Sequence, residues 1–365
     1  MLLRTFLPLT FIAGCATAAE LPLERIRLPE GFSISLYAEG VDNARQMALG
    51  ANGTLFVGSR SAGNVYALVD RDSDQRADES FVIDFGLRMP TGLAFRDGAL
   101  YVGAISLILR YDDIEERLAN PPEPVVVKGD LPRDTHHGWK YLGFGPDGKL
   151  YVPVGAPCNV CEPPPPFATI QRMDPDGRNM ETYASGIRNS VGFAFHPGTG
   201  DLWFTDNGRD RMGDNLPPGE LNHARAAGLH FGYPYCHGGS VVDPRYGGEK
   251  GCDNGYEPPA QALGAHVAPL GVTFYTGDMF PPAYRNQVFI AEHGSWDRSA
   301  KIGYRVMLVR LDVAGKATSY EPFAEGWLKG QSNWGRPADV LVMPDGALLV
   351  ADDQAGAIYR IAYRE

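Results

Sequence analysis

Apolar and polar residues alternate along short runs over most of the chain, and glycine-containing turns separate these runs. The clearest case is residues 47–69, "MALGANGTLFVGSRSAGNVYALV", where an Asn-Gly turn joins two apolar runs and a polar turn leads into a third. Alternation with period two predicts strands with one buried face. Asn-Gly and Asp-Gly turns favour tight hairpins, because glycine adopts positive φ at no steric cost. This segment therefore predicts three consecutive antiparallel strands.

The same pattern recurs to the end of the chain. The other copies are "TGLAFRDGALYVGAISLILRY" (91–111), "LGFGPDGKLYVPVGA" (142–156), "VGFAFHPGTGDLWFTDNG" (191–208), "GVTFYTGDMFPPAYRNQVFIAEHG" (271–294) and "ADVLVMPDGALLVADDQAGAIYRI" (338–361). Repetition of a β-motif every few tens of residues predicts an all-β fold, a six-bladed β-propeller. We expect the strand in residues 31–40 to join the last blade and close the ring, which would hide the open sheet edges.

The composition agrees with this fold class and narrows the choice of partners. The 365 residues include 44 glycines and 29 prolines, which suits a turn-rich β protein. The net charge of −11 argues against nucleic acid, because no basic stripe is present to neutralise phosphates.

The N-terminus predicts export. Residues 1–19 combine one arginine, an apolar run and small residues, which is typical of an export signal. "IAGC" resembles a lipoprotein box that would lipidate Cys15, whereas Ala16-Thr17-Ala18 resembles an ordinary cleavage site. We therefore expect a periplasmic protein or one anchored to a membrane by lipid at Cys15. The propeller would occupy residues 20–365.

Four further cysteines follow the signal, and an even number in an exported chain favours two disulfides. Chain proximity favours the pairs Cys158–Cys161 and Cys236–Cys252, although four cysteines allow three pairings. The sequence "CNVCE" lacks the histidine of a c-type haem site, and no second CxxC supports zinc.

Unusual polar residues precede or follow the predicted inner strands, where side chains face the central channel of a propeller. They are Arg60, His136, His137, Arg188, Asn189, the segment 205–215, Lys301 and Arg336. Cations that recur at equivalent blade positions suggest a shared anion with several carboxylates. Within 205–215, we expect Asp206, Asp210 and Asp214 to be turn and surface carboxylates rather than a separate metal site.

These segments resemble the soluble glucose and sorbosone dehydrogenases, six-bladed propellers that use pyrroloquinoline quinone (PQQ). The resemblance covers the mature chain in order, and it is closer to the sorbosone-type branch. It rests on "HHGWKYLGFGPDGKLYVPVG", "SGIRNSVGFAFHP", "TDNGRDRMGDNLPPGELNHARAAGLHFGYP", "FIAEHGSW" followed by "KIGYRV", and "NWGRPADVLVMPDGALLVADD".

The resemblance implies the catalytic roles. The family's histidine base lies seven residues before the Phe of the Phe-Gly-Pro-Asp turn, and counting back from Phe144 gives His137. This base would take the hydroxyl proton of a sugar while hydride passes to the quinone, a task that suits a pKa near neutrality. His136 is the competing candidate. Arg188 matches the arginine that stabilises charge on the quinone oxygens.

The resemblance also implies the cofactor contacts. Asn189 lies beside Arg188, Lys301 and Arg336 match cations that pair with cofactor carboxylates, and Arg60 is a weaker match. The family's calcium is held partly by two consecutive backbone carbonyls, which here would be those of Gly208 and Arg209. Arg209 stands where the glucose enzymes have proline, but ligation by a carbonyl does not depend on the side chain.

Two other functions remain open from the sequence. A metal-dependent lactonase would need a Glu, Asn and Asp converging on one metal, and the cations Arg188, Lys301 and Arg336 argue against it. A non-catalytic surface propeller that binds carbohydrate or protein would have lost the cofactor. The dehydrogenase interpretation implies a sugar, or an aldehyde or alcohol derived from one, as substrate. It also implies a quinone or a cytochrome as electron acceptor.

Overall fold

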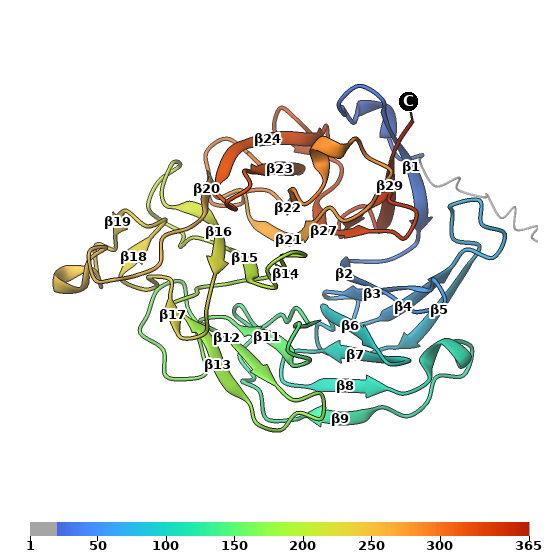
Figure 1. Cartoon of the computed structure of the whole chain (residues 1–365), viewed down its shortest axis with the longest axis horizontal. Helices are drawn as coiled ribbons and strands as arrows, with labels where there is room; N and C mark the ends of the chain where they lie inside the picture. Colours follow the sequence, from blue (N-terminus) through green and yellow to red (C-terminus); the bar gives the residue numbers. More distant parts are fainter. Residues whose placement is uncertain (1–19, 365) are drawn as a thin grey trace, which may run out of the picture.

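The computed structural model describes residues 20–364, and within them the chain forms a six-bladed β-propeller (Figure 1). The predicted all-β class and the blade number are therefore confirmed. Residues 1–19 lie outside the described part, so the export signal, the lipidation of Cys15 and the domain boundary at residue 20 stay predictions. In the described residues no helix is long and apolar enough to cross a membrane.

Each of the first three blades begins with its inner strand and proceeds outward through antiparallel neighbours. Blade one contains β2 (Ala44–Leu49), β3 (Leu55–Ser59), β4 (Val65–Val69) and β5 (Glu79–Asp84). Blade two contains β6 (Gly92–Arg96), β7 (Ala99–Gly103), β8 (Ile108–Tyr111) and β9 (Val125–Lys128). Blade three contains β10 (Gly143–Phe144), β11 (Leu150–Val154), β12 (Thr169–Met173) and β13 (Glu181–Ser185), and it gains β17 (Leu229–His230) as a parallel edge strand.

The last three blades follow the same plan. Blade four contains β14 (Phe193–Phe195), β15 (Leu202–Asp206), β16 (Pro218–Ala224) and β20 (Gln261–Ala265). Blade five contains β21 (Pro269–Phe274), β22 (Val288–Glu292), β23 (Arg305–Leu311) and β24 (Ala317–Glu325). Blade six contains β27 (Pro337–Val342), β28 (Leu348–Asp352), β29 (Ala357–Tyr363) and β1 (Phe32–Glu39).

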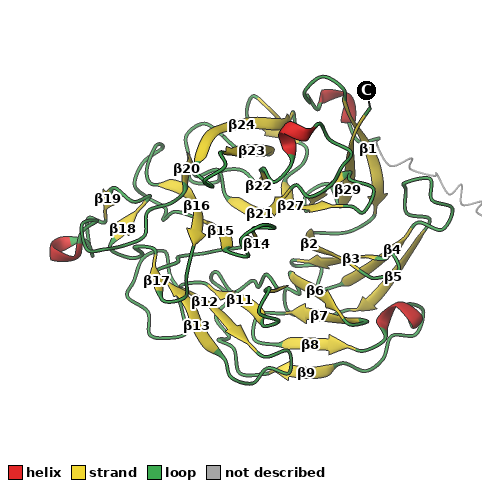
Figure 2. Cartoon of the chain, viewed as in Figure 1, coloured by secondary structure: helices red, strands yellow, loops and turns green. Residues whose placement is uncertain are grey.

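The remaining elements are small and lie in loops (Figure 2). Two hairpins stand outside the blades, and they are β18 (Cys236–His237) with β19 (Val241–Val242) and β25 (Leu328–Lys329) with β26 (Ser332–Asn333). The helices described are four single 3-10 turns, Leu23–Arg25, Ile114–Glu116, Gly248–Lys250 and Pro282–Tyr284.

The N-terminal strand closes the ring, as the sequence predicted. β1 pairs antiparallel with β29, the third strand of the last blade, with Phe32 opposite Tyr363 and Glu39 opposite Ala357. This pairing joins the two ends of the chain. It also gives blade six its fourth strand, so the outer edge of β29 has backbone hydrogen-bond partners.

Buried apolar clusters lie between successive blades and hold them at fixed angles. Phe56 of blade one stacks on Phe95 of blade two with ring centroids 5.9 Å apart, and both belong to one cluster. A similar cluster joins blade six to blade one, where Tyr37 of β1 packs with Leu55 and Tyr66. Because every blade packs on two neighbours, the positions of the loops at the centre follow from this shared core.

Both predicted disulfides, Cys158–Cys161 and Cys236–Cys252, are present. The first closes the loop of Asn159, which contacts Arg188, and the second closes a loop with the hairpin of β18 and β19 at the outer edge of the propeller (Figure 1). Disulfides of this kind are typical of proteins from oxidising compartments.

We expect replacement of Tyr37 by alanine to destabilise the whole ring. The Tyr37 side chain is 2% exposed and contributes to the core between the first and last blades. Loss of a buried aromatic ring costs about 3–5 kcal/mol. Urea unfolding would measure the loss. Ser35→Ala, on the exposed face of the same strand, should stay within about 0.5 kcal/mol of the parent. Equal effects of the two changes would contradict the proposed role of Tyr37.

Candidate functional site

A cavity of about 630 Å³ lies at one end of the propeller axis. Its walls come from loops that precede inner strands, such as 135–139, and from loops that follow second strands, such as 207–210. In an antiparallel blade, the start of the first strand and the end of the second lie at the same edge. The repeated hairpin therefore gathers distant parts of the chain around one cavity.

Four arginines line this cavity, Arg45, Arg60, Arg188 and Arg336. Arg45 is buried, and its Nη2 donates to Asp353 Oδ2 at 2.7 Å. The Nε of Arg45 is also buried and finds no partner among the described residues. An unpaired buried guanidinium nitrogen is costly unless a ligand supplies an acceptor.

Asp353 also binds a histidine of the cavity wall, His293, whose Nε2 lies 2.8 Å from Asp353 Oδ1. Burial lowers the pKa of His293 to about 4, against the opposing effect of the carboxylate. Although burial alone would raise the pKa of Asp353, Arg45 and His293 hold it below its ordinary value. Asp353 is thus ionised and neutralises one of the four arginines.

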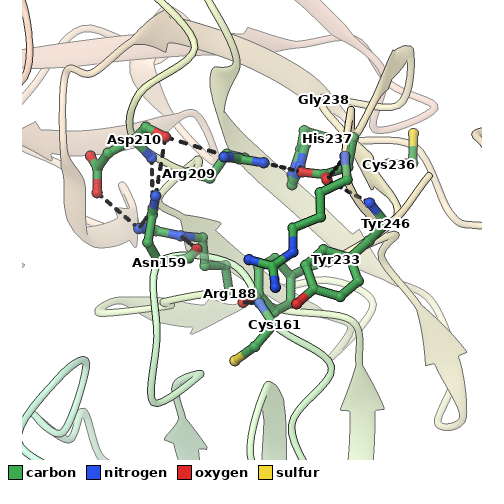
Figure 3. Close-up of polar contacts among 12 residues, drawn as sticks. Asn159, Cys161, Arg188, Arg209, Asp210, Tyr233, Cys236, His237, Gly238 and Tyr246 are labelled. Carbon is green, nitrogen blue, oxygen red and sulfur yellow. Dashed lines mark hydrogen bonds and ion pairs between the residues drawn. The ribbon is translucent and has the colours of Figure 1, made fainter.

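Arg188 is held by a loop that the first disulfide closes. Its Nε donates to the backbone carbonyl of Asn159 and its Nη2 to Asn159 Oδ1, both at 2.8 Å. Nη2 also contacts Asp210 Oδ2 at 3.1 Å, and Nη1 donates to the carbonyl of Asn207 at 3.0 Å. Figure 3 shows Asn159 between Arg188 and Asp210. The Asn159 side chain completes this arrangement because its amide binds both the N–H and the C=O of Asp210.

The other two cavity arginines have no carboxylate partner within hydrogen-bonding distance in the described chain. Arg336 donates from Nε and Nη2 to the carbonyls of His293 and Gly294, both at 3.0 Å. Arg60 lies over the ring of Trp139, 5.1 Å from its centroid. Burial and then the charge of Arg45 lower the pKa of Arg60. Because Arg60 and Arg336 are not neutralised, the cavity favours an anion.

A buried carboxylate fixes the backbone beside Arg188. Asp206 Oδ2 accepts the Arg188 N–H at 2.8 Å, and Oδ1 accepts the Asn189 N–H at 2.6 Å. Asp206 is 5% exposed, so our expectation of a turn or surface carboxylate is wrong for this residue. The reason is that β15 ends inside the ring, where Asp206 accepts hydrogen bonds from the backbone of the loop between β13 and β14. Asp210 instead pairs with Arg188 in the cavity wall, and Asp214 accepts from Ser299 at the surface.

A second buried carboxylate, Glu220, lies opposite Asp206 on the neighbouring strand β16. Glu220 accepts the Gly238 N–H at 2.6 Å and the Asn222 amide at 2.9 Å. Burial raises the pKa of both carboxyl groups, and the charge of Asp206 raises that of Glu220 further. With its pKa raised to about 8, Glu220 keeps its proton near neutral pH, so the two groups are not both ionised there.

His137 lies in the cavity wall with an unusual backbone conformation. Its φ is 52°, in the left-handed region that non-glycine residues rarely adopt, and such strain is often found at functional sites. Its Nδ1 lies 2.8 Å from the carbonyl of Ala156, so Nδ1 carries the proton and Nε2 keeps its lone pair. Gly155 permits this position, because a Cβ there would lie 2.7 Å from His137 Cβ.

The pKa of His137 is far from neutral. Burial lowers it to about 2, and the charges of Arg188 and His136 add to this effect. The expectation of a pKa near neutrality is therefore wrong for this structure, where His137 stays neutral at ordinary pH. His136 packs beside it with ring centroids 4.1 Å apart, and its pKa is also lowered, chiefly by burial.

The remaining predicted cofactor residues take different positions. Asn189 lines the cavity, and its Oδ1 accepts from Trp139 Nε1 at 3.1 Å. Lys301 lies outside the cavity lining, and its Nζ donates to Asn333 Oδ1 at 2.7 Å. The structure thus brings together Arg60, Arg188, Asn189 and Arg336 with both histidines, but not Lys301.

The two predicted calcium ligands lie at the cavity edge. Gly208 lines the cavity, whereas the guanidinium of Arg209 turns away to Asp243 Oδ2 at 2.5 Å. Asp243 also binds His237 Nε2 at 2.9 Å, and both residues lie in the loop that the Cys236–Cys252 disulfide closes (Figure 3). Arg188 and Arg209 donate instead to the neighbouring carbonyls of Asn207 and Asp210, and among the described residues no hydrogen bond reaches the carbonyl oxygens of Gly208 and Arg209.

The cavity fits an anion with several carboxylates. Two arginines without carboxylate partners line the same cavity as Arg45, whose Nε is unpaired, and guanidinium groups are well suited to bind carboxylates. Sequence reasoning missed Arg45, Asn159, His293 and Asp353. A signal was present for His293 and Asp353, which lie in the motifs "FIAEHGSW" and "NWGRPADVLVMPDGALLVADD", whereas Arg45 and Asn159 lie outside the motifs.

The chain belongs to the family described as "Domain of unknown function (DUF7133)", whose model matches residues 18–360. An uncharacterized protein of Borreliella burgdorferi is 32% identical over 367 residues, covering 97% of this chain and 95% of its own. An uncharacterized protein of Synechocystis sp. is 26% identical, covering 78% of this chain and 59% of its own.

Solved structures with the same fold include sugar oxidoreductases. A Trichoderma reesei protein of Carbohydrate-Active Enzymes Family AA12 gives a TM-score of 0.81 at 18% identity, covering 95% of this chain and 100% of its own. The PQQ domain of Coprinopsis cinerea pyranose dehydrogenase gives a TM-score of 0.78 at 17% identity, covering 92% of this chain and 97% of its own. PQQ-bound aldose sugar dehydrogenase from Streptomyces coelicolor gives a TM-score of 0.65 at 20% identity, covering 93% of this chain and 100% of its own. At these identities the likeness establishes the fold.

We predict that Glu220→Gln will change how stability depends on pH. The folded protein keeps a proton on Glu220 that the unfolded chain releases above about pH 4.3. Stability should therefore decrease as pH rises from there through neutrality. Glutamine cannot release a proton, so the variant should lose part of this decrease in urea titrations from about pH 4.5 to 8.5. Glu79→Gln, on an exposed edge strand, should follow the parent. A Glu220 variant with the parent's pH profile would show that Glu220 does not hold this proton in the folded protein.

Proposed function

We propose that this protein is a PQQ-dependent oxidoreductase that oxidises a sugar, or an aldehyde or alcohol derived from one. The observation that carries the proposal is the convergence of Arg45, Arg60 and Arg336 on the cavity that also holds His137. A neutral substrate gives no reason to bury so many cations, whereas a cofactor with three carboxylates would pair with them.

Several residues would hold the cofactor. Arg60, Arg336 and Arg45 would bind its carboxylates, and Asn189 beside Arg188 would donate to its ring oxygens. The backbone carbonyls of Gly208 and Arg209 would hold the calcium that the family resemblance implies. When bound, the quinone supplies the chemistry that this chain lacks, which is the acceptance of a hydride.

His137 would act as the general base. Its Nδ1 proton is held by the Ala156 carbonyl, so Nε2 is available to take the hydroxyl proton of the substrate as the C–H bond breaks. The low pKa of His137 keeps this nitrogen unprotonated before a ligand binds. A bound anion would oppose the effect of Arg188 and raise the pKa, which makes the imidazole a stronger base during turnover.

Arg188 would stabilise the negative charge that develops on oxygen. Asn159, Asn207 and Asp210 already bind its guanidinium through four contacts, so the group is fixed before any ligand enters. Such preorganised donors contribute to rate because they need no rearrangement as charge develops.

The relatives in fold support the proposed substrate class. They include a pyranose dehydrogenase, an aldose sugar dehydrogenase and a glucose dehydrogenase, all sugar oxidoreductases. An aldose or a sorbosone-like compound is therefore the proposed substrate, with a quinone or a cytochrome as the final acceptor. The two disulfides support export, and the lipid at Cys15 remains part of the proposal.

Replacement of Arg336 should weaken cofactor binding. A charge-assisted pair is worth about 1.5–3 kcal/mol, so Arg336→Ala should raise the Kd for PQQ roughly ten- to a hundredfold. The measurement is a titration of purified protein with PQQ and calcium, followed by the absorption of the quinone. The sequence assigned the same role to Lys301. Its Nζ is bound to Asn333 outside the cavity, so Lys301→Ala should have the smaller effect.

Two results would count against this cofactor site. Failure of the parent protein to bind PQQ would favour the non-catalytic propeller. Binding by the parent that Arg336→Ala leaves unchanged would place the quinone elsewhere on the molecule.

The two adjacent histidines allow a matched test of the base. His137→Ala should retain PQQ affinity and lose about 10²–10⁴-fold in kcat, the usual contribution of positioned proton transfer. His136→Ala should lose much less. Both variants are assayed by dye reduction with aldoses. A substrate deuterated at the oxidised carbon reports whether hydride transfer limits the rate.

Because both histidines lie in one loop, general disruption would affect the two variants alike. If His136→Ala is the inactive variant, the base is His136. If both variants match the parent, neither histidine is the base and the assignment fails.

A further inference from the structure

Three metal-ligating side chains meet at the rim of the cavity, and the proposed chemistry does not use them together. They are Asp210 after β15, His266 between β20 and β21, and Asp297 after β22. Each offers one ligand atom, and the three atoms lie within 4.8 Å of one another. Asp210 and His266 line the cavity, and the exposed Trp296 beside Asp297 also lines it.

Each of these side chains uses one polar atom for a hydrogen bond and keeps a second one for a metal. His266 Nε2 lies 2.8 Å from the carbonyl of Gly213, so Nε2 donates its proton and Nδ1 keeps its lone pair. Metal-binding histidines commonly donate their second ring N–H to a backbone carbonyl in this way. The imidazole is therefore oriented and in the tautomer that a metal requires.

The two carboxylates are oriented in the same manner. Asp210 Oδ2 accepts from Arg188 at 3.1 Å, and Asp297 Oδ2 accepts the backbone N–H of Arg211 at 2.7 Å. In each case Oδ1 has no partner among the described residues. Ligating carboxylates are typically hydrogen-bonded through the oxygen that does not bind the metal.

The loops that carry the three residues are tied to one another. Ser299 N donates to Asp214 Oδ1 at 3.0 Å, which joins the loop of Asp297 to the loop of Asp210. Asn159 Oδ1 accepts the Asp210 N–H at 2.9 Å from the other side. The cluster is thus held together without a metal, so binding would need little rearrangement.

From this geometry we infer that Asp210, His266 and Asp297 form a site for a divalent transition metal such as Zn²⁺ or Mn²⁺. One imidazole nitrogen with two carboxylate oxygens suits these ions, whereas calcium takes oxygen ligands. The two carboxylates balance the charge of the ion, although Arg188 offsets part of their negative charge. Three protein ligands leave positions open for water or for oxygens of a ligand entering the cavity.

The three side-chain ligands of this site differ from the two backbone carbonyls, of Gly208 and Arg209, that the resemblance implies for calcium, and its test does not need the quinone. It also differs from the cluster Asp70, Asp72 and Asp78 in the β4–β5 loop, which has only carboxylates and is largely exposed. That second cluster provides a control.

Isothermal titration of the purified protein with ZnCl₂ and with MnCl₂, without quinone or sugar, tests the inference. We expect one site that excess CaCl₂ does not block. His266→Ala and Asp297→Asn should each weaken binding about tenfold or more, while Asp72→Asn binds as the parent does. The amide introduced by Asp297→Asn retains an oxygen for the Arg211 N–H, so this variant keeps the loop contact. Mn²⁺ should also quench the fluorescence of Trp296, and Trp296→Phe identifies that signal.

The inference is overturned if the parent binds neither ion or if both ligand variants bind as the parent does. It is also overturned if Asp72→Asn removes the site. Should a ligand variant unfold, anomalous scattering from parent crystals soaked in ZnCl₂ decides, because the peak must lie among the three side chains. Every readout uses the metal alone, so failure of PQQ binding would leave this result unaffected.

Discussion

The antiparallel pairing of β1 with β29 is the constraint on which the rest of the structure depends. It joins the first strand to the last blade and brings Tyr37 into the core between blades six and one. With the ring closed, six inner strands hold their loops at fixed positions around one axis. The cavity is composed of side chains from Arg45 to Arg336, so opening this contact would disperse the site.

A fixed ring allows the protein to bury charges that would otherwise repel one another. Arg45 is paired with Asp353 and Arg188 with Asp210, while Arg60 and Arg336 have no carboxylate partner in the described residues. Burial already lowers the pKa of Arg60, a sign of its unfavourable surroundings. The cavity therefore holds uncompensated positive charge, and an anionic ligand would stabilise the folded protein as well as bind to it.

The sequence was sufficient for the fold because hairpin information is local. The Asn-Gly turn at 52–53 and the alternation around it predict a hairpin without knowledge of the rest of the chain. Within the site, His137 and Arg188 were found through motifs. Arg45 and the role of Asp206 could not be found, because both residues lie in apolar strands. Their roles depend on Asp353 and on the loop at 188–189, which only the closed ring brings close.

Charge is distributed unevenly around the cavity, and this division links the two ligands proposed for it. Arg45, Arg60 and Arg336 come from blades one and six, whereas Asp210, His266 and Asp297 come from blades four and five. Arg188, in the loop between β13 and β14, lines the same cavity and contacts Asp210 directly. A metal bound at Asp210 would weaken that ion pair and leave the Arg188 guanidinium freer to donate hydrogen bonds to an anion. Binding of a metal at Asp210 and binding of an anion at Arg188 would therefore favour each other through the contact between these two residues.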